Sequence, residues 1–115
     1  VFVQSFPEAT TRTMISSSGG SQPRWRRGGK ELFFVAHDGR LMAAPLAFNA
    51  NHMLESGLPV ALFSTHMPGG AVPSPQKQQY AVSVDGQRFL LNTIVGDTSS
   101  ASVSLILNWH PPDGK

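Results

Sequence analysis

Glycine-containing turns interrupt this chain before any apolar run grows longer than a single strand, which limits the folds that it can adopt. Between residues 21 and 46, the largely apolar block Glu31–Ala36 is flanked by turns at Gly28-Gly29 and Asp38-Gly39. Short apolar runs bounded in this way are typical of antiparallel strands joined by hairpins. Asp-Gly between two such runs favours a type I′ turn, which needs positive φ at both central residues. We therefore expect three consecutive strands of one meander in this stretch.

The rest of the chain follows the same pattern. No segment carries a helical period of apolar residues over three turns, and 11 Gly and 9 Pro among 115 residues favour a turn-rich β protein. We expect one short helical turn at Met53–Glu55 and otherwise an all-β fold. The predicted strands span residues 1–6, 11–16, 22–26, 31–36, 40–46, 59–64, 78–83, 88–93 and 101–109. In the last of these, alternation places four apolar residues on one face: Val103, Leu105, Leu107 and Trp109.

Charge and composition argue against several classes of function. Only 14% of the residues are charged and the formal net charge is +2, which is far from the dense basic surface of a nucleic-acid-binding protein. The absence of cysteine excludes disulfides and thiolate metal sites. No apolar run in this segment is long enough to span a membrane. Val1 stands within a strand pattern without an initiator Met, so we expect the N-terminus to be a fragment boundary.

Two segments of the chain repeat at an offset of 57 residues, which aligns Gly29 with Gly86. In this alignment Trp25 and Val82 take the same inward position before the turn. Each unit reads as strand, glycine turn, buried strand, hairpin, strand, loop and outer strand. That order is typical of a blade of a β-propeller, in which four-stranded sheets pack face to face around an axis. The offset exceeds the roughly 40–45 residues of a compact blade, and a loop at 67–76 accounts for the surplus.

Both units resemble the TolB-like propeller repeat, whose core reads approximately Pro-x-Trp-Ser-Pro-Asp-Gly-Lys-x-Leu followed by two apolar residues. The segments that carry the resemblance are QPRWRRGGKELFFVAHDGRLMAAPL at 22–46 and YAVSVDGQRFLLNT at 80–93. The layout is similar to the last blades of the propellers that follow bacterial Ser/Thr protein kinase domains. Two positions depart from the pattern, because Gly28 replaces the usual Asp and Val84 the usual Pro. Since an Asp side chain accepts backbone N–H bonds in such turns, we expect the first turn to be less fixed.

The resemblance implies a single partial propeller of about two to two and a half blades, which leaves the ring incomplete. Its parts are expected to be the end of a first blade at 1–20, a complete blade at 21–66, a loop at 67–77, a partial last blade at 78–109 and a tail at 110–115. Propellers close with four to eight blades, so such a segment leaves an apolar face and a strand edge open. We expect either a longer parent chain or self-association that covers them. In one version, residues 11–16 of one copy supply the missing outer strand of the last blade of another.

The histidines do not indicate a metal site. His37, His52, His66 and His110 all lie in predicted turns or loops, without the i, i+4 spacing of paired ligands. A metal site needs several ligands that converge on the ion. We therefore expect four solvent-exposed turn residues.

Nucleophile and acid–base patterns are also missing from the sequence. No G-x-S-x-G elbow is present, and the serine runs at 16–18 and 99–100 have the composition of loops. Three aspartates stand beside glycine, where an Asp serves the turn itself: Asp38, Asp85 and Asp97. Gly28-Gly29 precedes a strand rather than a helix, so the phosphate site of a helix N-terminus is lacking.

One basic cluster interleaves an aromatic residue with cations: Arg24, Trp25, Arg26, Arg27 and Lys30. Stacking on Trp25 would suit nucleic acid or an acidic ligand. In a strand, however, Arg24 and Arg26 point to one side while Trp25 and Arg27 point to the other. We therefore favour Trp25 packed between two blades over a binding patch.

The sequence thus nominates no catalytic, cofactor-binding or metal-ligating residue and no cofactor. The resemblance implies a non-catalytic binding, sensing or protein-interaction scaffold within a larger bacterial signalling protein, with an extracytoplasmic location if it is the sensor region of a kinase. No kinase motif occurs in the chain itself. Binding is expected at the loops 17–22, 67–76 or 96–100. The alternatives are the gating propeller of a prolyl-oligopeptidase-like hydrolase and a free-standing small β protein that self-assembles.

Overall fold

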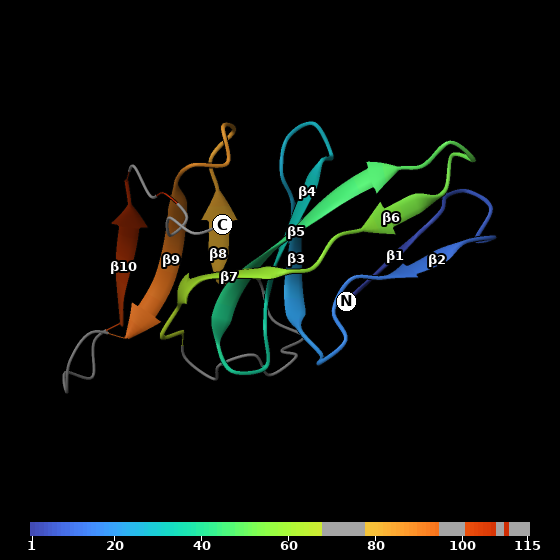
Figure 1. Cartoon of the computed structure of the whole chain (residues 1–115). Coiled ribbons are helices and arrows are strands. Elements are labelled where there is room, and N and C mark those ends of the chain that lie inside the picture. The colour runs from blue at the N-terminus through green and yellow to red at the C-terminus, as the bar shows by residue number, and fades with distance from the viewer. Residues whose placement is uncertain (68–77, 95–100, 108–109, 111–115) are drawn as a thin grey trace.

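The computed structural model describes residues 1–67, 78–94, 101–107 and 110, and within them it contains antiparallel strands and no helix (Figure 1). The all-β fold expected from the sequence is therefore confirmed. The strands are β1 (Phe2–Gln4), β2 (Arg12–Met14), β3 (Ser21–Trp25), β4 (Glu31–Val35), β5 (Arg40–Phe48), β6 (Leu54–Ser56), β7 (Val60–Ser64), β8 (Tyr80–Val82), β9 (Phe89–Ile94) and β10 (Ala101–Ile106). Nothing in the described part of the chain forms an apolar helix of membrane-spanning length. Several predicted segments lie outside the described residues: most of the loop at 67–76, the loop at 96–100, Trp109 and the tail at 111–115.

A central sheet is organised by β5, which is long enough to pair with three other strands. Along one edge, β5 pairs with β4 from Leu41 to Pro45, and β3 continues the sheet beyond β4. Along the other edge, the first part of β5 pairs with β7, and its last residues, Leu46 to Phe48, pair with β6. The strands β3, β4, β5 and β7 thus form one antiparallel meander, from which the β5–β6 hairpin projects (Figure 1).

The helical turn predicted at Met53–Glu55 is wrong, because these residues enter strand β6. The side chain of Asn49 decides this local structure. Its Oδ1 accepts the N–H of Asn51 at 2.9 Å and the N–H of Met53 at 3.0 Å, while its Nδ2 donates to Glu55 at 2.8 Å. An Asn side chain that binds nearby backbone in this way offers the chain an alternative to a helix. The segment therefore closes as a hairpin.

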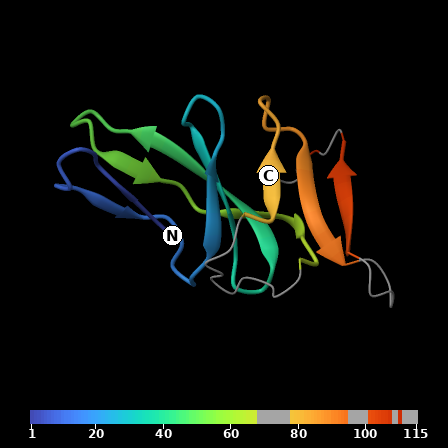
Figure 2. The same ribbon diagram turned by 180° about the vertical axis from the view of Figure 1, so that it is seen from behind.

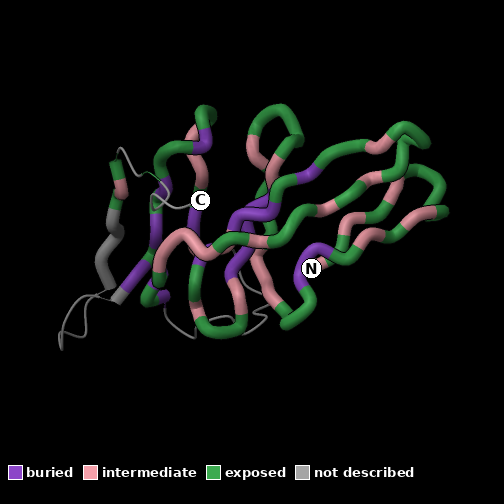
Figure 3. The backbone as a smooth tube through the Cα atoms, viewed as in Figure 1, coloured by how far each residue is buried: buried purple, intermediate pink, exposed green. Residues whose placement is uncertain are grey.

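The central sheet is packed on both faces. Because alternate side chains of a strand point to opposite sides, Phe33 and Val35 of β4 face the sheet of β8, β9 and β10, whereas Leu32 and Phe34 face β1 and β2. Figures 1 and 2 show the same order of sheets from opposite sides, and Figure 3 shows the buried residues gathered along the central sheet and its neighbours. One core cluster consists of Phe33, Val35, Leu41, Ala43, Met67, Tyr80, Phe89 and Leu91. The other consists of Ile15, Leu32, Phe34, Ala44 and Leu46.

The hairpin between β4 and β5 turns at Asp38-Gly39 as predicted, but its geometry is not type I′. Gly39 has a φ of 85°, whereas Asp38 does not have a positive φ. The N–H of Gly39 donates to the carbonyl of Ala36 at 2.9 Å, and the N–H of Ala36 donates to the carbonyl of Arg40 at 2.8 Å. This is a three-residue loop in which a type I turn is followed by a left-handed glycine. Asp38 keeps an ordinary φ because its carboxylate accepts the N–H of Arg40 at 3.1 Å.

The two aligned glycine turns share one conformation at Gly29 and Gly86, with φ of 70° and 71°. The preceding position differs between them. Gly28 has a φ of 94°, as at the third position of a type II turn, whereas Asp85 has no positive φ and its Oδ1 accepts the N–H of Gln87 at 2.9 Å. The first turn therefore lacks the side-chain bond that fixes the second.

Repeat-equivalent residues bridge the central sheet and the sheet of β8, β9 and β10. Gln22 and Gln79 lie 57 residues apart, and Nε2 of Gln22 donates to Oε1 of Gln79 at 3.0 Å while the N–H of Gln79 donates to Oε1 of Gln22 at 2.7 Å. The hydroxyl of the buried Tyr80 donates to the carbonyl of Gln22 at 2.7 Å. Gln22 has a φ of 55° and lies at an irregularity in the β3–β4 register. We call these three residues the glutamine bridge.

Two further contacts join the same pair of sheets. The rings of Phe33 and Phe89 meet edge to face, with centroids 5.2 Å apart. Nη2 of Arg26 donates to the carbonyl of Asp85 at 3.0 Å, and the Arg26 side chain lies over Gly86. Aromatic pairs of this kind contribute about 0.5–1.5 kcal/mol beyond the area that they bury.

The exposure of Trp25 corrects one expectation, whereas the alternation predicted at residues 105–107 is confirmed. Trp25 is 52% exposed rather than packed between sheets, because in the described part of the chain the sheet that covers its face consists of the two strands β1 and β2. Phe6 lies beyond the end of β1 and is 94% exposed. On β10 and just beyond it, Leu105 and Leu107 are exposed while Ile106 packs against the core.

Candidate functional site

The four histidines are exposed, as the sequence predicts. His37 lies in the β4–β5 turn, His52 in the β5–β6 turn and His66 just after β7, and His110 is the last described residue. Among the described residues, no three histidine, aspartate or glutamate side chains come together in a group that would hold a metal ion.

The basic cluster around Trp25 is divided between two sides of the central sheet. Arg26 lies on the side of β8, where its Nη1 pairs with Oε2 of Glu31 at 3.0 Å and its Nη2 binds Asp85. Trp25 lines a groove on the opposite side, next to β1 and β2. The predicted alternation of Arg26 and Trp25 is therefore confirmed. The guanidinium and the indole do not form one surface on which a base would stack.

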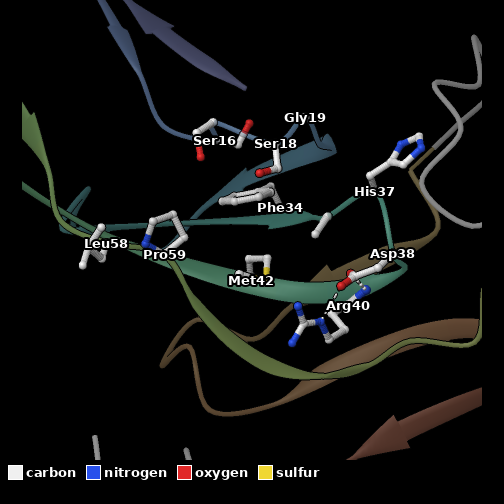
Figure 4. A pocket seen from close by; sticks show the side chains of 12 residues that line it. Ser16, Ser18, Gly19, Phe34, His37, Asp38, Arg40, Met42, Leu58 and Pro59 are labelled. Carbon is white, nitrogen blue, oxygen red and sulfur yellow. Dashed lines mark hydrogen bonds and ion pairs between the residues drawn. The ribbon is translucent and has the colours of Figure 1, made fainter.

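A cleft of about 570 Å³ lies between the loop that follows β2 and the β4–β5 hairpin (Figure 4). Phe34 and Met42, from neighbouring strands, lie along its base, and Leu58 and Pro59 close one end. Ser16 and Ser18 lie along its upper rim, and Asp38 and Arg40 form the end opposite to Leu58 (Figure 4). Ser17 also lines the cleft. We call this the Asp38–Arg40 cleft.

The charged end of the cleft is an ion pair within one turn. Nε of Arg40 donates to Oδ2 of Asp38 at 2.7 Å, and the N–H of Arg40 donates to Oδ1 at 3.1 Å. These two bonds, the backbone one first, hold the pKa of the Asp38 carboxyl below its ordinary value. Asp38 therefore stays ionised at mildly acidic pH and keeps the Arg40 guanidinium in place.

Serine, histidine and aspartate side chains all line this cleft, but they are not arranged as a catalytic triad. A triad needs a hydroxyl bound to the imidazole and an acid bound to the other ring nitrogen. Within the described residues, neither Ser17 nor Ser18 forms a hydrogen bond with His37, and Asp38 is held by Arg40 rather than by His37. These side chains therefore do not form a triad within the described part of the chain.

A second groove, of about 510 Å³, lies between the β1–β2 hairpin and the central sheet. Trp25 and Phe48 line it from the central sheet, and Val3 and Phe6 line it from the first hairpin. It contains no ion pair between described residues. We call it the Trp25 groove.

Sequence reasoning located part of this site and missed the rest. The loop predicted at 17–22 supplies part of the rim of the cleft, and Asp38 serves the turn in which it lies. The apolar end at Leu58 and the presence of Ser18 and Met42 in one cleft depend on the packing of distant segments. The glutamine bridge had a visible signal, since the repeat alignment places Gln22 opposite Gln79, but alignment alone does not show that equivalent residues touch.

No protein-family model, no curated protein and no solved structure matches this chain. The sheets, the cleft and the glutamine bridge therefore carry the functional argument.

Proposed function

We propose that this chain is a segment of a β-propeller that serves as a non-catalytic binding or sensing scaffold. The observation that carries the proposal is the direct bond between Gln22 and Gln79. Gln22 lies in β3, the first strand of the central sheet, and Gln79 directly precedes β8, the first strand of the next sheet. When sheets radiate from an axis, the first strands of neighbouring sheets lie closest to it, and equivalent residues on them come within reach of one another.

The packing around the central sheet supports the same interpretation. A propeller blade has a neighbouring blade on each face. The central sheet likewise packs against another sheet on each of its two faces. Val82 packs against the core beneath β8, whereas its repeat-equivalent Trp25 faces the Trp25 groove. A complete neighbouring blade would cover Trp25 as the central sheet covers Val82.

A non-catalytic role fits the chemistry of the Asp38–Arg40 cleft. Its carboxylate is occupied by Arg40, and its serines and His37 are not connected within the described part of the chain. The proposed parent is a larger signalling protein, of the kind in which a propeller follows a bacterial Ser/Thr kinase domain. In that setting the segment would supply a binding surface, and another domain the chemistry.

The DNA on both sides of the coding segment tests this proposal. It predicts further units with a Gly-turn core and, upstream, a kinase domain and a membrane span. An α/β-hydrolase domain downstream would instead identify the gating propeller of a peptidase. A start codon directly before Val1 and a stop codon directly after Lys115 would identify a free-standing β protein.

Self-association is the form that the proposal takes if the 115-residue chain is the whole protein. The open side of the Trp25 groove would then be covered by another copy. Light scattering measures the mass of the assembly, and the fluorescence of Trp25 measures whether its indole is covered. Trp109→Phe leaves Trp25 as the one indole of the chain. A concentration-dependent blue shift that accompanies a rise in mass supports the association, and a monodisperse monomer with a solvent-exposed indole removes it.

A further inference from the structure

Among the described residues of the Asp38–Arg40 cleft, the Arg40 guanidinium carries unpaired nitrogens that can only donate hydrogen bonds. Both oxygens of Asp38 already accept bonds from Arg40. Arg40 uses only its N–H and Nε in these bonds, so Nη1 and Nη2 have no partner among the described residues. The hydroxyls of Ser17 and Ser18 likewise have none within that part of the chain. A ligand that completes the bonds of the guanidinium must bring acceptors, and the hydroxyls can donate to the same acceptors.

The end of the cleft at Leu58 and Pro59 is lined by apolar side chains and suits an apolar part of a ligand. Met42 and Pro59 are partly buried there, and Leu58 is 88% exposed. Figure 4 shows Leu58 and Pro59 at the end opposite to Arg40, with Met42 between them. An apolar chain laid along this base would remove apolar surface from water, at about 25 cal/mol for each Å².

The charges of the cleft favour a ligand whose acceptor group carries a single negative charge. Asp38 and Arg40 cancel one another, and among the described residues that line the cleft Arg40 is the one arginine or lysine. A dianion such as phosphate would place two charges beside the Asp38 carboxylate, and like charges at close range repel. A carboxylate places one, and it matches the two Nη donors of a guanidinium in a planar bidentate pair.

We propose, on the basis of the binding role proposed above, that the Asp38–Arg40 cleft binds small amphiphilic carboxylates. The carboxylate pairs with Nη1 and Nη2 of Arg40, and the apolar chain lies along Met42 toward Leu58. Asp38 holds the guanidinium through Nε, so little side-chain freedom is lost on binding. Free aliphatic acids and peptide C-termini with an apolar last residue share this chemistry.

Titration of the 115-residue chain with hexanoate, followed by amide NMR shifts, tests this inference. Hexanamide is the matched neutral control because it has the same size and apolar chain. We expect saturable shifts within residues 16–19 and 37–42, and binding of hexanoate at least about tenfold tighter than that of hexanamide. Equal binding of the two, or shifts confined to other segments, would overturn the inference.

Two variants assign the two ends of the ligand. Arg40→Gln should weaken hexanoate binding about tenfold and leave hexanamide unchanged, whereas Arg27→Gln, on an exposed arginine outside the cleft, should change neither. Leu58→Ser should weaken both ligands, because it removes apolar surface without touching the guanidinium. An Arg40→Gln chain that binds hexanoate as the native chain does would contradict the assignment.

The source of the carboxylate is identified by a second pair of ligands. A short peptide that ends in leucine is compared with the same peptide amidated at its C-terminus. Tighter binding of the free peptide than of hexanoate assigns the cleft to chain termini, and the reverse assigns it to small acids. If neither ligand binds while Tyr80 remains buried, the inference fails, and the propeller proposal is still decided separately by the flanking DNA.

Discussion

Gln22 takes part in three hydrogen bonds that join the central sheet to the sheet of β8, β9 and β10. Its side chain binds Gln79 through both the amide nitrogen and the amide oxygen, and its carbonyl accepts the hydroxyl of Tyr80. Its backbone has a φ of 55°, a left-handed conformation that is uncommon for a residue other than glycine. Such a conformation persists only where the surroundings over-determine it. Here the three bonds across the sheet contact supply that support.

Gly29 and Gly86 form a matched pair for measuring the contact of Arg26 with the neighbouring sheet. Both have nearly the same positive φ, so Gly29→Ala and Gly86→Ala should each cost about 1–2 kcal/mol of backbone strain. A Cβ at Gly29 meets nothing within 4 Å, whereas one at Gly86 lies 2.6 Å from Nε of Arg26. Gly86→Ala should therefore lower the free energy of unfolding by about 1 kcal/mol more than Gly29→Ala. Urea unfolding measures both values, and equal losses would show that Arg26 does not lie over Gly86.

Asp85 should make the stability of the chain depend on pH in the acid range. Hydrogen bonds from Ser83 and then from the N–H of Gln87 hold the pKa of the Asp85 carboxyl below its ordinary value. A lowered pKa in the folded state stabilises the fold above the unfolded value, and this contribution is lost as the pH falls through the folded value. Asp85→Ala should thus be less stable than the native chain at neutral pH, and the difference should shrink as the pH falls below the ordinary carboxyl value. Urea midpoints measured across pH would contradict this if the difference were the same at both ends.

At the scale of elements, the hairpins follow from local sequence and their exceptions follow from side chains. Glycine turns and apolar runs predict every strand of the central meander within a few residues. The pattern fails at β6, because a three-residue run does not reveal that Asn49 ties the preceding loop into a hairpin. It also misses the geometry at Asp38, since type I and type I′ loops accept the same Asp-Gly pair.

The β5–β6 hairpin should loosen when the side chain of Asn49 is removed. Asn49→Ala eliminates the bonds to Asn51, Met53 and Glu55, which should lower the local opening free energy by about 1 kcal/mol. Hydrogen exchange of the β6 amides reports this directly. Asn51→Ala is the matched control, because Asn51 takes part through its backbone N–H. Equal exchange in the two variants would show that the hairpin does not depend on Asn49.

At the scale of the whole molecule, the repeat predicts the stacking of sheets but not which surfaces remain open. The 57-residue offset identifies equivalent positions, and the structure places the equivalents Gln22 and Gln79 in contact. Trp25 shows the limit of the repeat, because the exposure of a side chain depends on how many strands its neighbouring sheet has. The Asp38–Arg40 cleft could not be predicted for a similar reason, since its walls come from segments that meet only after the sheets have stacked.

Tyr80 allows the stacking of the two sheets to be tested by one titration, because it is the single tyrosine of the chain. It is 3% exposed, and its hydroxyl donates to Gln22 of the neighbouring sheet. Burial raises the pKa of Tyr80 well above its ordinary value of 10.0. A raised pKa in the folded state stabilises the fold below the unfolded value and is lost as the pH rises further.

The alkaline titration of tyrosinate absorbance in the folded chain is therefore the most direct measurement of the face-to-face packing on which the propeller proposal depends. We predict that the folded chain shows no ionisation near pH 10.0, and that tyrosinate appears only at higher pH, together with unfolding. The chain in denaturant, as the control, should titrate near the ordinary value. A reversible midpoint near pH 10.0 in the folded chain would show that Tyr80 is open to water, and would contradict the stacking of the central sheet on β8, β9 and β10.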